Sequence, residues 1–169
     1  MDKDLIIFFA TTLDRIVILG LFLYFVFLFL YKKEKKVVLS DFIFCLFSAL
    51  VTLSISMIIK ESFMIERPFI RSDFSPLFLP FDPYSFPSSH ASVFFAISGA
   101  LFFLKKRIWP IFFLASFLIA TARVLSGVHT FYDCFVGGLL GIFISYIIYK
   151  FLIKFFKLLL SLSSINSKY

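Results

Sequence analysis

The amino-acid sequence predicts an all-α protein, a multi-pass transmembrane helix bundle of about five spans preceded by an N-terminal helix at the membrane interface. Of the 169 residues, 61% are hydrophobic and 16% are charged, and the mean hydropathy is +1.01. Soluble domains average about half apolar and a quarter charged residues, so this chain has too little polar surface for a water-exposed globule. Several apolar runs also reach the roughly 18 residues that a membrane-spanning helix needs.

Charged residues delimit the expected helices. Residues 1–13 mix charged and apolar side chains, which favours a short helix lying in the interface. Asp14 and Arg15 are costly at mid-membrane, so we expect the first span to begin after them. The expected spans are residues 16–31, 37–59, 89–104, 108–122 and 131–149. Gly137 and Gly141 in the last span indicate close helix packing.

The remaining segments are expected outside the membrane. Residues 60–88 hold most of the prolines, which prevents a further span there. Four side chains of this loop could shape the entrance to a site but are interpreted as solvated, namely Arg71, Asp73, Asp82 and Tyr84. Residues 150–169 are expected to form a tail on the cytoplasmic side, with 151–162 lying along the surface. The whole chain, residues 1–169, is treated as one domain whose polar motifs fall within residues 60–133.

The distribution of basic residues predicts the orientation. Eleven of the 17 Lys and Arg residues fall on one side of the expected spans, and the positive-inside rule places that side in the cytoplasm. The net charge of +7 is explained by these loops, so nucleic acid is not expected as a partner. The protein is predicted to lie in the plasma (inner) membrane with the 60–88 loop on the outer, periplasmic or extracellular face.

Polar residues gather in three groups at that outer face. Lys60 and Arg67 are seven residues apart, which on a helix would place both on one face of the outer end of the second span. Both cations could then point at one anion. Ser88, Ser89 and His90 open the third span, where free backbone N–H groups bind anions. Helix capping alone remains an alternative explanation for the two serines.

The third group combines a cation, an imidazole and a carboxylate. Arg123 ends the fourth span, and His129 and Asp133 are four residues apart at the start of the fifth. At that spacing the carboxylate can reach the imidazole, fix its tautomer and stabilise its protonated form. A single histidine near an interface is more often structural, but both histidines of this chain fall at the same membrane depth.

Together these groups suit phosphoryl transfer. One imidazole would attack phosphorus, the second would protonate the leaving oxygen, and the cations would stabilise the equatorial oxygens. Two histidines and one aspartate could instead bind zinc, but the surrounding cations would repel it. We therefore expect neither a metal nor any other cofactor.

At these residues the sequence resembles the type 2 phosphatidic acid phosphatase (PAP2) superfamily, whose pattern has three parts. The first, K-x6-R-P, is matched in full by Lys60 to Pro68. The second, P-S-G-H, reads Pro87-Ser88-Ser89-His90, with Ser89 in place of glycine. The third, S-R-x5-H-x3-D, keeps its spacing from Arg123 through His129 to Asp133, with alanine in place of the serine.

The resemblance implies a role for each matching residue. His129 would be the nucleophile that forms a phosphohistidine, with Asp133 as its orienting partner. His90 would protonate the leaving group and later activate water. The residues expected to hold the phosphate are Lys60, Arg67, Ser88, Ser89 and Arg123. Phosphatases of the family work without a metal, and its membrane members usually have six spans rather than five.

The sequence therefore predicts a lipid phosphatase with an outward-facing site. The best candidate substrate is undecaprenyl diphosphate, cleaved to undecaprenyl phosphate. Phosphatidylglycerophosphate, phosphatidic acid and the phosphate of lipid A remain alternatives. A non-catalytic binder or transporter of a lipid phosphate is the alternative from another class, and a structural subunit whose motif residues only cap helices is a third.

Overall fold

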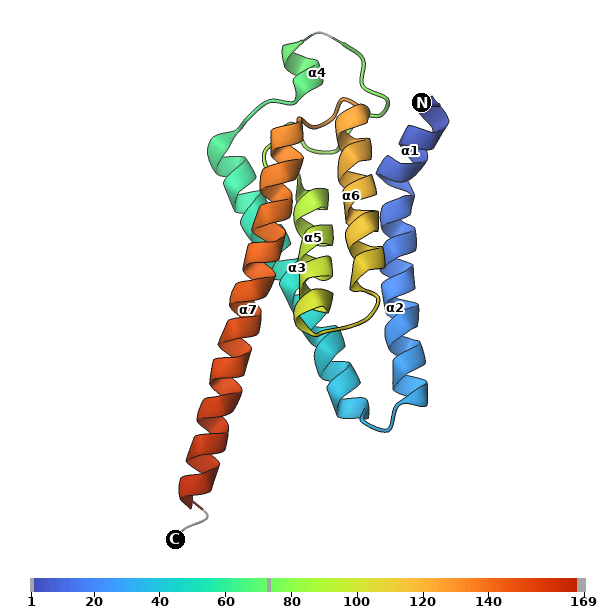
Figure 1. Ribbon diagram of the computed structural model, residues 1–169. Coiled ribbons are helices and arrows are strands. Elements are labelled where there is room, and N and C mark those ends of the chain that lie inside the picture. Colours follow the sequence, from blue (N-terminus) through green and yellow to red (C-terminus); the bar gives the residue numbers. More distant parts are fainter. Residues whose placement is uncertain (1, 73, 167–169) are drawn as a thin grey trace.

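The fold is a bundle of α-helices that run roughly along one axis (Figure 1). The computed structural model describes the chain over residues 2–72 and 74–166, and the side chains as far as residue 153 except residue 73. Within these ranges it forms α1 (Lys3–Thr11), α2 (Leu13–Tyr31), α3 (Lys35–Phe63), α4 (Pro68–Arg71), α5 (Ser89–Phe103), α6 (Trp109–Leu125) and α7 (Phe131–Asn166).

The central helix is α5. It packs against α3, α6 and α7, and Figure 1 shows it between α6 and α7, with α3 crossing behind. Its sequence suits this position because it has no charged side chain after His90 and alternates bulky with small residues. Ala91, Ala96 and Ala100 are completely buried, and such small side chains let neighbouring helices approach closely.

Helix lengths confirm the multi-pass prediction in outline. Three helices are long and apolar enough to cross a membrane, at Leu13–Tyr31, Lys35–Phe63 and Phe131–Ile153. The helices α5 and α6 are shorter, with 15 and 17 residues, or about 22 and 25 Å at 1.5 Å per residue. The first turn of α5 consequently lies below the adjacent ends of α6 and α7 (Figure 1).

Two helix boundaries differ from the prediction. The first span does not begin after Arg15, because α2 starts at Leu13 and Asp14 lies in its first turn. The helix that contains the last predicted span, α7, continues beyond residue 149 to Asn166. Figure 1 shows it running straight past the ends of the other helices. After Gly141 no glycine or proline interrupts the helix before Asn166.

The predicted N-terminal helix is present as α1, and it packs against the bundle. Ile6 and Ala10 are buried, and α1 contacts α6. Asp2 caps this helix through a hydrogen bond from the backbone N–H of Asp4, 3.2 Å long. Because Thr12 alone separates α1 from α2, the position of α1 fixes the start of α2.

The two ends of the bundle differ in the polar residues that they contain. The basic end holds the α2–α3 and α5–α6 connections, with Lys32–Lys36 and Lys105–Arg107. A short ion pair between Lys106 and Asp41 fastens the α5–α6 connection to α3 there. The opposite end, called the site end below, holds α4, residues 72–88 and the α6–α7 turn (Figure 1). All three predicted polar groups lie at the site end.

Glycines of α7 bring it close to α5, as the sequence predicted. A Cβ atom added at Gly141 would lie 2.2 Å from the carbonyl oxygen of Ser92, and one at Gly137 would lie 2.8 Å from that of Ser88. Both contacts are to backbone, which cannot swing aside. The two glycines therefore set the distance between α7 and the first turns of α5.

We expect Gly141→Ala to lower the free energy of unfolding by about 1–3 kcal/mol, because the helices must separate. The control is Gly20→Ala in α2, where nothing lies within 4 Å of the added Cβ. There we expect no loss, or a gain of up to about 1 kcal/mol from the higher helix propensity of alanine. Thermal unfolding in detergent measures both, and equal midpoints for the two variants would contradict the packing explanation.

Candidate active site

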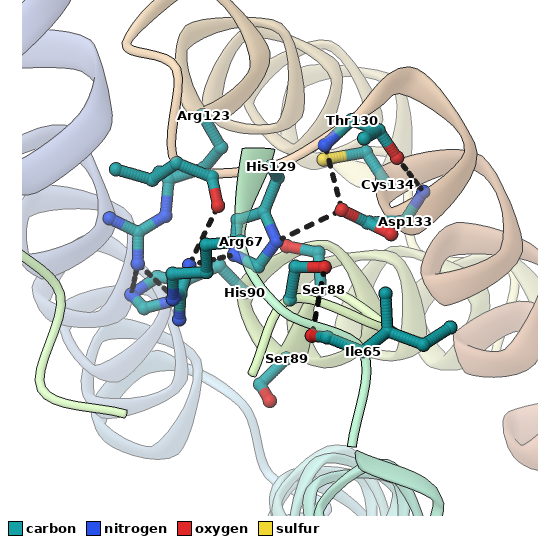
Figure 2. Close-up of polar contacts among 12 residues, drawn as sticks. Ile65, Arg67, Ser88, Ser89, His90, Arg123, His129, Thr130, Asp133 and Cys134 are labelled. Atoms are coloured by element: carbon teal, nitrogen blue, oxygen red, sulfur yellow. Dashed lines mark hydrogen bonds and ion pairs between the residues drawn. The ribbon is translucent and has the colours of Figure 1, made fainter. Parts of the chain in front are cut away.

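Three cations converge at the site end from separate parts of the chain. Lys60 lies in the last turn of α3, Arg67 precedes α4, and Arg123 lies in the last turn of α6. All are buried, with 5%, 2% and 7% of their surface exposed. Figure 2 shows Arg67 and Arg123 beside both histidines. The predicted convergence of the motifs on one place is therefore confirmed.

Lys60 and Arg67 meet in a different way from the one their spacing suggested. The helix α3 ends at Phe63, and Met64 turns the chain in a left-handed conformation with φ of 48°. Arg67 is extended and does not share a helix face with Lys60. The two cations meet through Asp82, whose Oδ2 lies 3.1 Å from Lys60 Nζ and whose Oδ1 forms a short ion pair with Arg67 Nη2.

Asp82 was expected to be solvated, and it is the main anionic partner of these cations. Its side chain is 49% exposed, and its carbonyl oxygen also accepts a 2.8 Å hydrogen bond from Arg67 Nε. Burial alone would raise the pKa of Asp82, but Lys60 and Arg67 hold it below its ordinary value. A carboxylate thus occupies the place where the sequence predicted a phosphate.

The α6–α7 turn places Arg123 and His129 together. Gly127 adopts φ of 78°, and a Cβ there would lie 2.5 Å from the ring of Phe74, so the turn requires glycine. The backbone N–H of His129 donates to the carbonyl of Arg123 across 3.3 Å. The imidazole and the guanidinium are therefore held by one backbone turn.

His129 lies between a carboxylate and a guanidinium. Its Nδ1 is 3.6 Å from Asp133 Oδ2, and its Nε2 is 3.4 Å from Arg67 Nη1. The same Nη1 donates a 2.8 Å hydrogen bond to the carbonyl of Val128, which fixes the guanidinium. The predicted pairing with Asp133 is confirmed, although His129 itself precedes α7 rather than lying on it.

A reciprocal cap holds Asp133 in place. Its Oδ2 accepts a 2.7 Å hydrogen bond from the backbone N–H of Thr130, and its own N–H donates to Thr130 Oγ1 across 3.2 Å. This is the capping-box arrangement at the start of a helix, built here with aspartate. The carboxylate is therefore oriented toward Nδ1 of His129 before any ligand binds (Figure 2).

Burial lowers the pKa of His129 to about 4. Asp133 opposes this shift, whereas the positive charges of Arg67, Arg123 and Lys60 add to it. His129 is therefore a neutral imidazole at neutral pH. Nδ1 faces the Asp133 carboxylate at 3.6 Å without a hydrogen bond, and Nε2 faces the guanidinium of Arg67, so a proton on Nδ1 would leave the lone pair of Nε2 on the side of Arg67.

His90 is in contact with Arg123 on one side and a carboxylate on the other. Arg123 Nη2 lies 2.6 Å from Nδ1 of His90, and Arg123 Nη1 donates to the carbonyl of Ala10 across 3.2 Å. On the other side, Nε2 of His90 lies 3.5 Å from Asp14 Oδ2. Sequence reasoning missed Asp14, although an ionisable side chain in an apolar helix is a signal of function.

The two serines of the second motif differ in their surroundings. Ser88 is the N-cap residue of α5, and its backbone N–H donates to the carbonyl of Asp133 across 3.0 Å. Its side chain makes no cap hydrogen bond, and its buried Oγ has no hydrogen-bond partner. The hydroxyl of Ser89 instead lies 3.2 Å from that of Ser56 in α3. An anion here would meet the backbone N–H groups of the first turn of α5.

An apolar groove adjoins this end of the bundle. It has a volume of about 410 Å³ and lies between α6 and α7, with Phe95 of α5 also lining it. Val124, Phe131 and Cys134 line it next to the catalytic candidates Arg123 and Asp133 in the sequence. The groove therefore lies along α6 and α7 beside the segments that carry Arg123 and Asp133.

The donor set suits an anion better than a metal. Within the described part of the chain, no three His, Cys, Asp or Glu side chains gather as metal ligands would. Three buried cations, the first turn of a helix and a neutral imidazole can bind a tetrahedral oxyanion and supply a nitrogen nucleophile to it.

Comparison with known proteins places this arrangement in context. The sequence profile of the PAP2 superfamily matches residues 39–157. A bacitracin transport permease protein, BcrC of Bacillus licheniformis, is 36% identical over 58 residues, which are 34% of this chain. The matched stretch spans 29% of that relative.

Two solved structures share the fold. A transmembrane PAP2 type phosphatidylglycerolphosphate phosphatase from Bacillus subtilis superposes with a TM-score of 0.64 and 24% identity, covering 90% of this chain and 77% of its own. LpxE of Aquifex aeolicus superposes with a TM-score of 0.58 and 29% identity, covering 87% of this chain and 93% of its own.

The protonation state of His129 can be measured directly. In a His90→Gln variant His129 is the remaining histidine, so its NMR signals need no further assignment. With a pKa of about 4, against 6.5 for an ordinary histidine, we expect the ring to stay neutral as the pH falls to about 5. A ring half protonated near pH 6.5 would contradict this.

The same shift has a consequence for stability. In the unfolded chain the ring of His129 is protonated at a higher pH than in the folded chain, because its folded-state pKa is lowered. The free energy of unfolding should therefore decrease as pH falls from 6.5 toward 4.

Proposed function

The chain belongs to the PAP2 superfamily, and from this premise we propose that it is a metal-independent phosphatase of membrane lipid phosphates or diphosphates. The observation that best supports the proposal is the environment of His129. The Asp133 carboxylate lies 3.6 Å from Nδ1, and the buried guanidinium of Arg67 lies 3.4 Å from Nε2. This polarises the ring toward an anionic substrate, so Nε2 is the nucleophile.

In the first step Nε2 of His129 attacks the phosphorus of the terminal phosphate. The bond from phosphorus to the leaving oxygen breaks as the phosphorus–nitrogen bond forms. His90 gives a proton to the leaving oxygen, which departs as an alcohol or, from a diphosphate, as a monophosphate. Asp133 stabilises the positive charge that develops on the ring of His129.

In the second step water removes the phosphoryl group. His90 takes a proton from the water molecule as its oxygen attacks phosphorus, and the phosphorus–nitrogen bond breaks. Orthophosphate leaves and His129 returns to its neutral form. Protein side chains supply each proton transfer and the nucleophile, so the proposed reaction uses no metal ion.

The cations hold the equatorial oxygens of the phosphate in both steps. We assign this role to Lys60, Arg67 and Arg123, together with the hydroxyl of Ser88, whose buried Oγ has no hydrogen-bond partner, and the backbone N–H of Ser89. The substrate phosphate takes the position of the Asp82 carboxylate between Lys60 and Arg67. Arg123 then turns from Nδ1 of His90 toward the phosphate, which frees Nδ1 for proton transfer.

A lipid substrate is supported by the groove between α6 and α7. Its lining is almost entirely apolar, and it adjoins Arg123 and Asp133 at the site end. The phosphorylated head of a lipid can reach the cations while its hydrocarbon chain stays in the groove. The excess of basic residues at the opposite end supports an active site that faces away from the cytoplasm.

Undecaprenyl diphosphate, cleaved to undecaprenyl phosphate, is the first candidate substrate. Phosphatidylglycerophosphate is the second, because the structural relative from Bacillus subtilis is a phosphatase of that lipid. Phosphatidic acid and lipid A phosphates complete the panel to be tested.

Binding or transport of a lipid phosphate without turnover is the alternative from another class. It is favoured by one observation, the similarity to a protein described as a bacitracin transport permease. A binder would use the same cations and would not need Nε2 of His129 as a nucleophile. Turnover therefore separates the two functions.

We expect the purified protein to release orthophosphate from at least one lipid of this panel in the presence of EDTA. His129→Ala should abolish release because the nucleophile is lost. Asp133→Asn should lower kcat by about two to four orders of magnitude, as expected when a carboxylate no longer fixes the tautomer. Lipid binding without phosphate release by the wild-type protein would instead favour the binder.

Asp82 provides a separate test of where the phosphate binds. Asp82→Asn removes a competing negative charge, so inorganic phosphate should inhibit about three- to tenfold more tightly, as expected for loss of one partly exposed ion pair. The control is Glu66→Gln, an exposed carboxylate beside Arg67, which should leave inhibition unchanged. Weaker inhibition in Asp82→Asn would contradict displacement of Asp82 by phosphate.

A further inference from the structure

Both histidines of the site face a carboxylate, but through opposite ring nitrogens. Nδ1 of His129 lies 3.6 Å from Asp133, whereas Nε2 of His90 lies 3.5 Å from Asp14. The other nitrogen of each ring faces a guanidinium, with Nε2 of His129 3.4 Å from Arg67 and Nδ1 of His90 2.6 Å from Arg123 Nη2, which also lies 3.0 Å from Nε2 of His90. The PAP2 sequence pattern includes Asp133 but does not include Asp14, so it assigns Asp14 no role.

Hydrogen bonds close to the active site hold Asp14 in position. Its Oδ1 accepts a 2.7 Å hydrogen bond from the backbone N–H of Arg15, which leaves Oδ2 for His90. The preceding helix is tied to the same place, because Arg123 donates to the carbonyl of Ala10. Asp14 is thus held against His90 by the first turn of α2 and by the packing of α1.

Burial makes a purely structural role for this carboxylate costly. Its side chain is only 17% exposed at the start of an apolar helix, where an ionised group needs a partner. His90 is that partner, and its own side chain is 35% exposed. The other charged groups facing His90 are Arg123 of α6 and Lys60 of α3, both positive. Among the described residues that act on His90, Asp14 is the negative group that can offset a proton on its ring.

We infer that Asp14 is the positioning residue of the general acid His90, an inference that rests on the proposed phosphatase function. Asp14 accepts the Nε2–H of His90 throughout the cycle, so the exchanged proton resides on Nδ1. When the leaving oxygen takes this proton, His90 becomes neutral, and the water of the second step returns a proton to Nδ1. Asp14 stabilises the ring while it is protonated, which is before the first step and after the second.

The need for an acid depends on the leaving group, and this gives a test specific to Asp14. An alkyl alcohol leaves only if it is protonated, whereas a nitrophenol leaves readily as its anion. We would compare kcat/KM for decyl phosphate and a decyl-substituted nitrophenyl phosphate, since kcat/KM covers the steps through departure of the leaving group. Asp14→Asn should lower kcat/KM about ten- to a hundredfold for decyl phosphate and less than about threefold for the nitrophenyl substrate.

Three controls separate positioning from a structural effect. Arg15→Gln changes the adjacent exposed side chain and should leave the ratio of the two substrates unchanged. His90→Gln should show the same selective loss, and adding Asp14→Asn to it should cause little further loss, because both changes remove one function. Thermal unfolding of each variant checks that the fold is kept.

The outcomes distinguish this inference from the function on which it rests. Equal losses for the two substrates in Asp14→Asn, or no loss for either, would overturn the role of Asp14 while leaving the phosphatase intact. A wild-type protein that releases phosphate from neither lipid nor aryl substrate would overturn both. A selective loss shared by Asp14→Asn and His90→Gln would establish the pair.

Discussion

Buried positive charge is the constraint that organises the site end of this protein. Removing a cation from water costs several kcal/mol unless carboxylates or carbonyl oxygens replace the lost hydration. Each cation here has such partners, drawn from distant segments. Arg67 is bound by the loop at Asp82 and by the carbonyl of Val128, and Arg123 is bound by the carbonyl of Ala10. Satisfying these charges draws the 72–88 loop, the α6–α7 turn and the N-terminal helix to one place.

The same charge determines the chemistry of the histidines. In a polar, solvated site a histidine titrates near neutral pH, but burial beside cations keeps His129 neutral and able to act as a nucleophile. The cost is that a positive ring would be disfavoured in the phosphorylated intermediate that we propose. Asp133 offsets that cost from a rigid helix start, through its cap with Thr130. The cations and the carboxylate are therefore parts of one electrostatic arrangement.

Much of this could be predicted from the sequence, because motif spacing fixes local partners. The approach of Asp133 to His129 follows from four residues at a helix start, and the helix packing at Gly141 follows from small residues four apart. Asp82 and Asp14 could not be found in this way. Both meet their partners through tertiary contacts between segments far apart in the sequence, which the spacing within a motif does not describe. The prediction that Lys60 and Arg67 share one helix face was wrong for a related reason. The helix ends between them, where Met64 adopts a left-handed conformation.

The three aspartates of the site differ in how readily they can give way to a substrate. Asp133 is buried and held by backbone and side chain of Thr130, and Asp14 is mostly buried on α2. Only Asp82 is half exposed and carried by a loop, so its displacement by phosphate moves the carboxylate into water rather than into the bundle. The groove between α6 and α7 is lined by apolar side chains, several of them exposed, such as Phe117 and Phe135. A ligand that fits both the cations at Asp82 and the apolar groove carries its charge at one end and hydrocarbon at the other. A lipid phosphate has this chemistry.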